Sequence, residues 1–245
     1  MNIRQILEPH LNEENVKGLE SIYQELLNRR QEVCPAVEGG EPGDFRRISQ
    51  YSLALRQAFL HRTIGTFAGA LVCLRENLLY SMVLSVRGNF ETTAALGYLY
   101  QRLDSCANGT LTREKIDDDI CGMILGTRNK PIPQAFEAKH VLTLLQHATK
   151  AVKKVTFTNQ SMPDGLLTEF YDFLCEFCHP NYSSNSVAFH LDKEGHQFRM
   201  RHDCKMLKVE SGMIEHLFIS VPLFIDLYDG IPRVLATIDA APRAT

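Results

Sequence analysis

The sequence lacks the features that assign many chains to a class at sight. It has no tryptophan among its 245 residues. It contains no glycine-rich phosphate loop, no His-Glu-x-x-His helix and no Gly-x-Ser-x-Gly turn. The usual motifs of nucleotide-binding proteins, zinc proteases and serine hydrolases are therefore absent. Residues 1–8 hold no long apolar run and no small-residue cleavage site, so the sequence predicts no signal peptide.

Charge of one sign does not predominate either. The chain has 26 basic and 29 acidic residues and a net charge of -3, so its overall field does not attract nucleic acid. The most apolar stretches, residues 77–101 and 213–228, are interrupted by charges such as Arg87 and Asp226, which argues against a membrane span. The seven cysteines are odd in number and predict reduced thiols. We therefore expect a cytoplasmic protein with no membrane partner.

Helical periodicity of the apolar residues dominates the chain. It predicts helices over residues 12–33, 45–60, 63–107, 112–125, 134–155, 161–179 and 211–228. The pattern of residues 186–202 instead predicts a small β-hairpin turned at Gly195. We expect one all-α domain over residues 1–235, a helical bundle around a long central helix with this hairpin inserted, and a mobile tail over residues 236–245.

The helix predicted over residues 63–107 is apolar on nearly all sides. Between Glu76 and Arg102 it carries only two charged residues, Arg87 and Glu91. A helix of this kind is buried on several sides, so we expect it to run through the middle of the bundle. Arg87 and Glu91 are one turn apart and can form an ion pair, which needs good hydrogen bonds if it is buried.

A Cys-x-x-Cys-His string, from Cys175 to His179, ends the helix over residues 161–179. Such a string attaches haem covalently in exported proteins, but this chain shows no export signal. Cys175 and Cys178 with His190 and His196 also come close to a Cys2His2 zinc spacing, although the cysteines lie on the helix and the histidines on the hairpin, the reverse of a zinc finger. We interpret the cysteines as core residues and expect no metal or cofactor, with a zinc-stabilised helical module as an alternative.

His179 is the candidate functional residue of this segment. Pro180 forces the chain out of the helix, which places the His179 ring at a helix end near an opening of the bundle. An arginine can hold an anion and a histidine can move protons, so Arg87, Glu91 and His179 form a candidate site. The competing interpretation is a purely structural network of the same residues.

Two motifs carry a family resemblance. The Arg-x-x-x-Glu of the central helix, Arg87 to Glu91, and the later Tyr-x-x-Leu-x(4)-His-Pro, Tyr171 to Pro180, resemble a family of uncharacterised bacterial helical proteins. That family is similar to HEPN domains, many of which are RNA-cleaving toxins or defence effectors. The resemblance covers about residues 50–200. HEPN ribonucleases use an Arg-x(4–6)-His motif, and His179 is not part of one.

The resemblance implies metal-independent cleavage of RNA. In that hypothesis His179 acts as general acid or base, Arg87 stabilises phosphate charge beside Glu91, and Tyr171 and Asn181 bind the substrate. A second hypothesis, from another class, is a non-catalytic interaction or regulatory protein that forms a homodimer through a face of the bundle. In both cases we expect a homo-oligomer.

Overall fold

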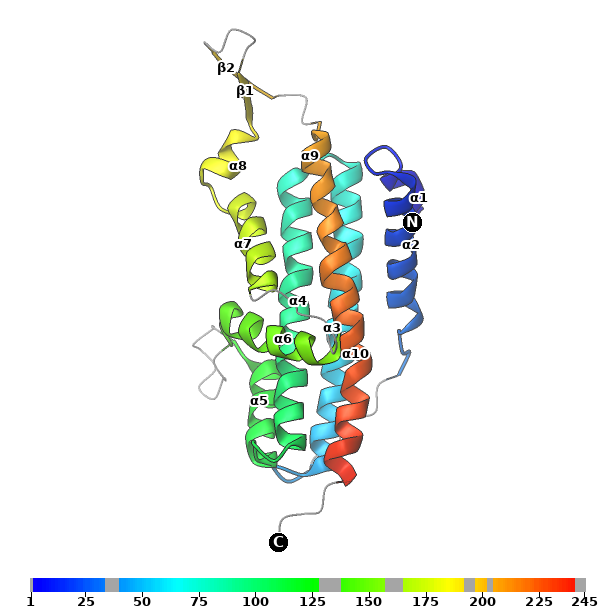
Figure 1. Ribbon diagram of the computed structural model, residues 1–245, viewed down its shortest axis with the longest axis vertical. Helices are drawn as coiled ribbons and strands as arrows, with labels where there is room; N and C mark the ends of the chain where they lie inside the picture. Colours follow the sequence, from blue (N-terminus) through cyan, green and yellow to red (C-terminus); the bar gives the residue numbers. More distant parts are fainter. Residues whose placement is uncertain are drawn as a thin grey trace.

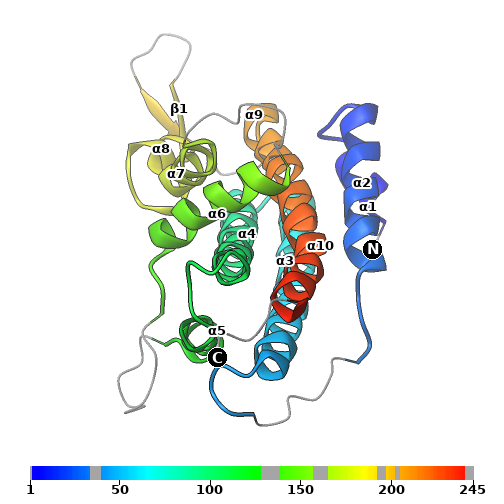
Figure 2. The same cartoon turned by 60° about the horizontal axis from the view of Figure 1, so that its bottom comes forward.

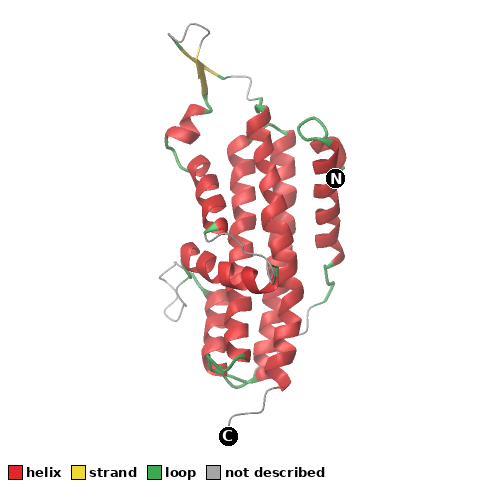
Figure 3. Cartoon of the chain, viewed as in Figure 1, coloured by secondary structure: helices red, strands yellow, loops and turns green. Residues whose placement is uncertain are grey.

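The computed structural model describes residues 2–33, 40–127, 138–156, 165–191, 197–201 and 205–240. Within them the chain is an all-α bundle with one small hairpin, as expected (Figures 1 and 3). The elements are α1 (Ile3–Leu7), α2 (Glu13–Asn28), α3 (Phe45–Arg75), α4 (Leu79–Ala107), α5 (Arg113–Leu125), α6 (Val141–Val155), α7 (Leu166–Cys178), α8 (Tyr182–Ser186), β1 (Phe189–Leu191), β2 (Phe198–Met200), α9 (Lys208–Ser211), the 3-10 turn η1 (Gly212–His216) and α10 (Leu217–Ala240). No helix in these residues has the length and apolar character needed to cross a membrane.

Helix α4 occupies the middle of the bundle. It packs against α3, α7 and α10, and α6 crosses it at mid-length (Figures 1 and 2). The close crossing depends on Gly97, since a Cβ built there would lie 2.6 Å from the Cβ of Ala148 on α6. Phe67, Phe90 and Phe224 fill the core around α4. The predicted central helix is therefore present, and its burial follows from its apolar surface.

The break between the two longest helices was predicted at the wrong residues. The chain stays helical through residues 61–62 and turns instead at residues 76–78. Asn77 there has a φ of 57°, a left-handed conformation that asparagine adopts more readily than most residues. Its side-chain oxygen also accepts a hydrogen bond of 3.1 Å from the backbone N–H of Met206. A long-range contact and one unusual φ thus decide a boundary that apolar periodicity does not show.

The C-terminal helix is longer than the sequence predicted. Helix α10 continues through Pro222 and Pro232 to Ala240, so the prediction of a mobile tail is wrong for residues 236–240; residues 241–245 lie outside the described part. Ile238 is 1% exposed, and its carbonyl accepts a hydrogen bond of 3.0 Å from Arg113 on α5. A helix-interior proline costs about 3 kcal/mol, and the burial of several large apolar side chains offsets that cost.

Of the remaining elements, the short helices α1 and α8 were not predicted, and the others agree with the sequence except at their ends. Asn12 caps α2 by accepting a hydrogen bond from Asn15, as predicted. Helix α6 begins at Val141, and the predicted start over residues 134–137 lies outside the described residues. Helix α7 begins at Leu166, and the predicted start at Ser161 likewise lies outside the described residues. The hairpin is present, with Gly195 outside the described residues, and it extends beyond the end of the bundle (Figure 1).

Candidate functional site

Arg87, Glu91 and Tyr171 come together between α4 and α7. Arg87 and Glu91 are one turn apart on α4, and Nη2 of Arg87 lies 3.1 Å from Oε1 of Glu91. Tyr171 reaches them from α7: its hydroxyl accepts from Nη2 and Nε of Arg87 at 2.8 and 3.2 Å, and donates to Oε1 of Glu91 at 3.3 Å. Each of the three side chains is thus hydrogen-bonded or ion-paired to the other two.

Within this cluster Tyr171 is buried, whereas the ion pair of Arg87 and Glu91 is partly exposed to solvent. Tyr171 is 4% exposed, whereas the side chains of Arg87 and Glu91 are 22% and 32% exposed. The burial that we expected for the ion pair is therefore only partial. Burial raises the pKa of Tyr171 to about 12, although the hydrogen bond from Arg87 opposes this. Burial also opposes the charge of Arg87, but its hydrogen bonds to Tyr171 and Cys178 prevail and raise its pKa.

Glu91 also connects the cluster to α3. Its second oxygen, Oε2, lies 3.9 Å from Nη2 of Arg62, and Nε of Arg62 donates to the hydroxyl of Thr92 at 3.0 Å. One carboxylate therefore links α3, α4 and α7. A side chain that links three helices contributes to their relative placement, whatever else it does.

His179 stands apart from the cluster. His179 is exposed at the end of α7, and its backbone is extended, as expected for a residue that precedes a proline. Within the described residues, no hydrogen bond, ion pair or ring contact joins its imidazole to Arg87, Glu91 or Tyr171. Its carbonyl accepts a hydrogen bond from the hydroxyl of Ser184. Of the residues that the sequence predicted to lie together, Arg87, Glu91 and Tyr171 therefore contact one another, and the His179 side chain is not bonded to them.

Asn181, expected to bind substrate, begins helix α8. Its side-chain oxygen accepts from the backbone N–H of Ser184 at 3.1 Å, and its amide donates to Glu176 at 2.9 Å. Both polar ends of the side chain are thus used in capping and in holding α8 against α7. This use is structural.

Cys175 and Cys178 are partly buried free thiols on α7. Burial is the largest influence on both, and it raises the pKa of each thiol even though Arg87 lowers it. Both thiols therefore stay protonated at neutral pH. The proposed zinc partners cannot be placed, because His196 and the side chain of His190 lie outside the described residues. Among the described side chains, no group of three His, Cys, Asp or Glu residues is placed to hold a metal.

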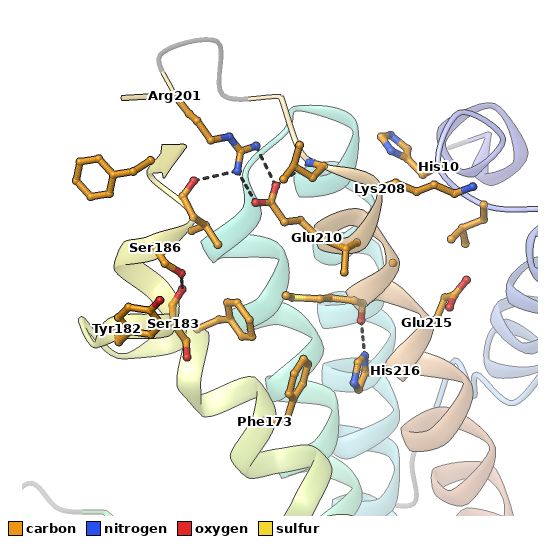
Figure 4. A pocket seen from close by; sticks show the side chains of 18 residues that line it. His10, Phe173, Tyr182, Ser183, Ser186, Arg201, Lys208, Glu210, Glu215 and His216 are labelled. Atoms are coloured by element: carbon orange, nitrogen blue, oxygen red, sulfur yellow. Dashed lines mark hydrogen bonds and ion pairs between the residues drawn. The ribbon is translucent and has the colours of Figure 1, made fainter. Parts of the chain in front are cut away.

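A groove that the sequence did not predict lies at the hairpin end of the bundle. A cavity of about 810 Å³ lies between α7, α8 and β1 on one side and α9 and η1 on the other (Figure 4). Its aromatic lining includes Phe173, Phe177, Tyr182 and Phe189. The ring of His216 stacks on Phe173 with centroids 5.3 Å apart, and burial lowers the pKa of this histidine. Aromatic residues four apart on α7, Phe173 and Phe177, were the signal in the sequence.

Comparisons with protein families, curated proteins and solved structures find no match to this chain. Function is therefore inferred from the geometry of these residues. Two features stand out: a polar cluster whose members bond to one another, and a largely apolar groove at one end of the bundle.

Proposed function

We propose that this protein is a non-catalytic interaction protein that acts as a homodimer. The observation that carries this proposal is the gathering of exposed apolar side chains around the groove. Monomeric proteins rarely expose a large contiguous apolar surface, and such a surface usually marks an interface. We call the following seven residues, with their exposed fractions, the apolar end: Tyr182 (87%), Val209 (75%), Phe198 (74%), Leu207 (54%), Met200 (50%), Phe173 (44%) and Phe189 (39%).

The size of the apolar end matches a dimer interface. Five of its residues line the groove. The other two adjoin Phe189 of the groove: the ring of Phe198 contacts the Phe189 ring, and Met200 pairs with Phe189 across the two strands. At roughly 150–250 Å² for a large aromatic side chain, the four aromatic residues of the apolar end expose about 500 Å², and Val209, Leu207 and Met200 bring the total to about 800 Å². A standard stable interface buries about 800 Å² on each partner.

The polar cluster supports the same proposal. Arg87, Glu91 and Tyr171 bond to one another, and among the described residues no histidine is hydrogen-bonded or ion-paired to them. The one carboxylate of the cluster, Glu91, is already paired with Arg87. A catalytic site needs groups that are free to contact a substrate and a base with access to the proton it removes. A network that joins three helices explains the same residues without a reaction.

Sedimentation velocity over a range of protein concentrations tests the proposal. We expect a species of twice the 27.8 kDa chain mass. Val209→Lys, at the apolar end, should convert it to monomer, because a lysine ammonium is costly to bury. Leu142→Lys is the matched control: Leu142 is also exposed (44%) but lies on α6, and its substitution should leave the dimer intact. A wild-type chain that sediments as monomer at every concentration would refute the proposal.

One observation favours a second candidate, the RNA cleavage that the HEPN resemblance implies. The exposed fractions of Arg87 and Glu91, 22% and 32%, let a phosphate approach the guanidinium. In that case purified wild-type protein cleaves RNA in the presence of a chelator. His179→Ala should then abolish cleavage while the melting temperature stays nearly unchanged. Intact RNA after incubation with the wild-type protein would reject this candidate.

A further inference from the structure

The hairpin is amphipathic and its apolar face is uncovered. Strands β1 and β2 pair with Phe189 opposite Met200 and Leu191 opposite Phe198. Because side chains alternate along a strand, Phe189, Phe198 and Met200 share one face, and Arg199 lies on the other. We call these three residues the apolar face of the hairpin. They are 39%, 74% and 50% exposed, so water reaches a surface whose composition is typical of a buried one.

Little in the described part of the chain packs against the apolar face of the hairpin. A two-stranded hairpin is marginally stable in water unless its apolar face packs against something. Phe189 and Phe198 contact each other edge to face with centroids 6.1 Å apart, which covers only part of the two rings. Strands β1 and β2 also lie beyond the end of the bundle, away from its long helices (Figure 1).

An ion pair nevertheless fixes the base of the hairpin. Nη1 of Arg201 donates to the carbonyl of Val187 at 2.9 Å and lies 2.5 Å from Oε1 of Glu210, and Nη2 donates to Oε2 of Glu210 at 3.1 Å (Figure 4). The two side chains are 13% and 4% exposed. Both ends of the hairpin are thereby held beside α9, and Phe189 is at once part of the apolar face and of the groove wall. A surface held in place before association loses less entropy when a partner binds.

We infer that a second copy of this chain covers the apolar face with its own, so that two hairpins pack face to face about a two-fold axis. This inference rests on the proposed homodimer and specifies its contact. A two-fold interface brings the same surface of both copies together, so the surface must be complementary to itself. An apolar face meets this condition. Arg199 is the one charged residue of the described strands, and it lies on the opposite face, so face-to-face packing brings no like charges of these two strands together.

The test replaces residues on the two faces of the same strand. The variant Phe198→Ser/Met200→Ser removes apolar side chains from the packed face, and Arg199→Ser is the control on the other face. The dimer dissociation constant is measured by sedimentation equilibrium, and circular dichroism confirms that both variants are folded. We expect the double variant to raise the dissociation constant by at least about a hundredfold, because each substitution acts in both copies. The control should change it by no more than about threefold.

Hydrogen exchange gives an independent measurement on the unmodified chain. Backbone amides of β1 and β2 should exchange more slowly as the protein concentration rises through the dissociation constant. A dimer that forms equally well in the double variant, with no concentration-dependent protection of the hairpin, would overturn the inference while leaving the homodimer intact. A chain that never dimerises would overturn both.

Discussion

Replacing Tyr171 with phenylalanine tests whether the polar cluster is structural. The substitution keeps the buried ring and removes one hydroxyl, which accepts two hydrogen bonds from Arg87 and donates one to Glu91. A hydrogen bond to a charged group contributes about 1.5–3 kcal/mol to stability. Arg87 and Glu91 still form their ion pair at 3.1 Å in the variant, and both side chains are partly exposed to water. We therefore expect Tyr171→Phe to lower the free energy of unfolding by about 1.5–2 kcal/mol.

Urea denaturation followed by circular dichroism measures this loss, and Tyr80→Phe is the control. The hydroxyl of Tyr80 donates to the carbonyl of Ser184 at 2.8 Å, but that acceptor is neutral and Tyr80 is 45% exposed. Its loss should cost about 0.5 kcal/mol. If both variants unfold at the same urea concentration as the wild type, the cluster does not hold α7 against α4. The structural interpretation would then be wrong.

The same tyrosine predicts a dependence on pH. Its pKa rises from the ordinary value of 10 to about 12 in the folded chain. Below about pH 10 the phenol is protonated in both states, so it adds no pH dependence. Between about pH 10 and 12 the unfolded chain has lost the proton that the folded chain retains, so stability falls as pH rises. Tyr171→Phe should reduce that fall by about 1.4 kcal/mol per pH unit, measured by urea denaturation at each pH. An unchanged slope would contradict the burial of this phenol.

Two further predictions concern the hairpin base and the helix crossing. Glu210→Gln should lower the free energy of unfolding by about 3 kcal/mol, because it takes a buried negative charge away from the guanidinium of Arg201. Urea denaturation measures this loss, and a loss below about 1 kcal/mol would show that the ion pair is hydrated. Gly97→Ala should lower the free energy of unfolding by about 2 kcal/mol or more in the same assay, since its new Cβ would lie 2.6 Å from the Cβ of Ala148. A Cβ at Gly65 would meet no atom within 4 Å, so Gly65→Ala should stabilise α3 by about 0.5–1 kcal/mol. Equal effects of the two glycine substitutions would contradict the close crossing.

The sequence predicted the fold where local patterns determine it. The apolar surface of the helix predicted over residues 63–107 identified a central helix, which the structure has over residues 79–107. Asn12 identified the start of α2, and alternation with a glycine turn identified the hairpin. It misplaced the boundaries that depend on distant contacts. Asn77 turns the chain at a site with no proline or glycine, and Pro232 lies within a helix because the residues around it are buried. Neither fact can be read from the neighbouring residues alone.

The candidate site shows the same division. Arg87 and Glu91 were paired by their spacing on one helix, and Tyr171 was added through a motif. His179 was placed beside them because a proline ends its helix, but where a helix ends does not decide which way its last side chain faces. The groove was missed because its walls come from residues 173–189 and 201–216, with His10 and Leu11 from near the N-terminus, and only the folded chain brings these segments together.

Helix α7 connects the polar cluster to the apolar end. Its inner face carries Tyr171, which is 4% exposed and bonded to α4, while Phe173 on its outer face is 44% exposed and lines the groove. The position of Phe173 therefore depends on how firmly Tyr171 holds the helix. We expect Tyr171→Phe to weaken self-association, since α7 then has fewer bonds to α4, but to do so less than the loss of Phe198 and Met200. Sedimentation equilibrium compares the two. If Tyr171→Phe abolishes the dimer while Phe198→Ser/Met200→Ser preserves it, α7 itself is the interface and the hairpin is not.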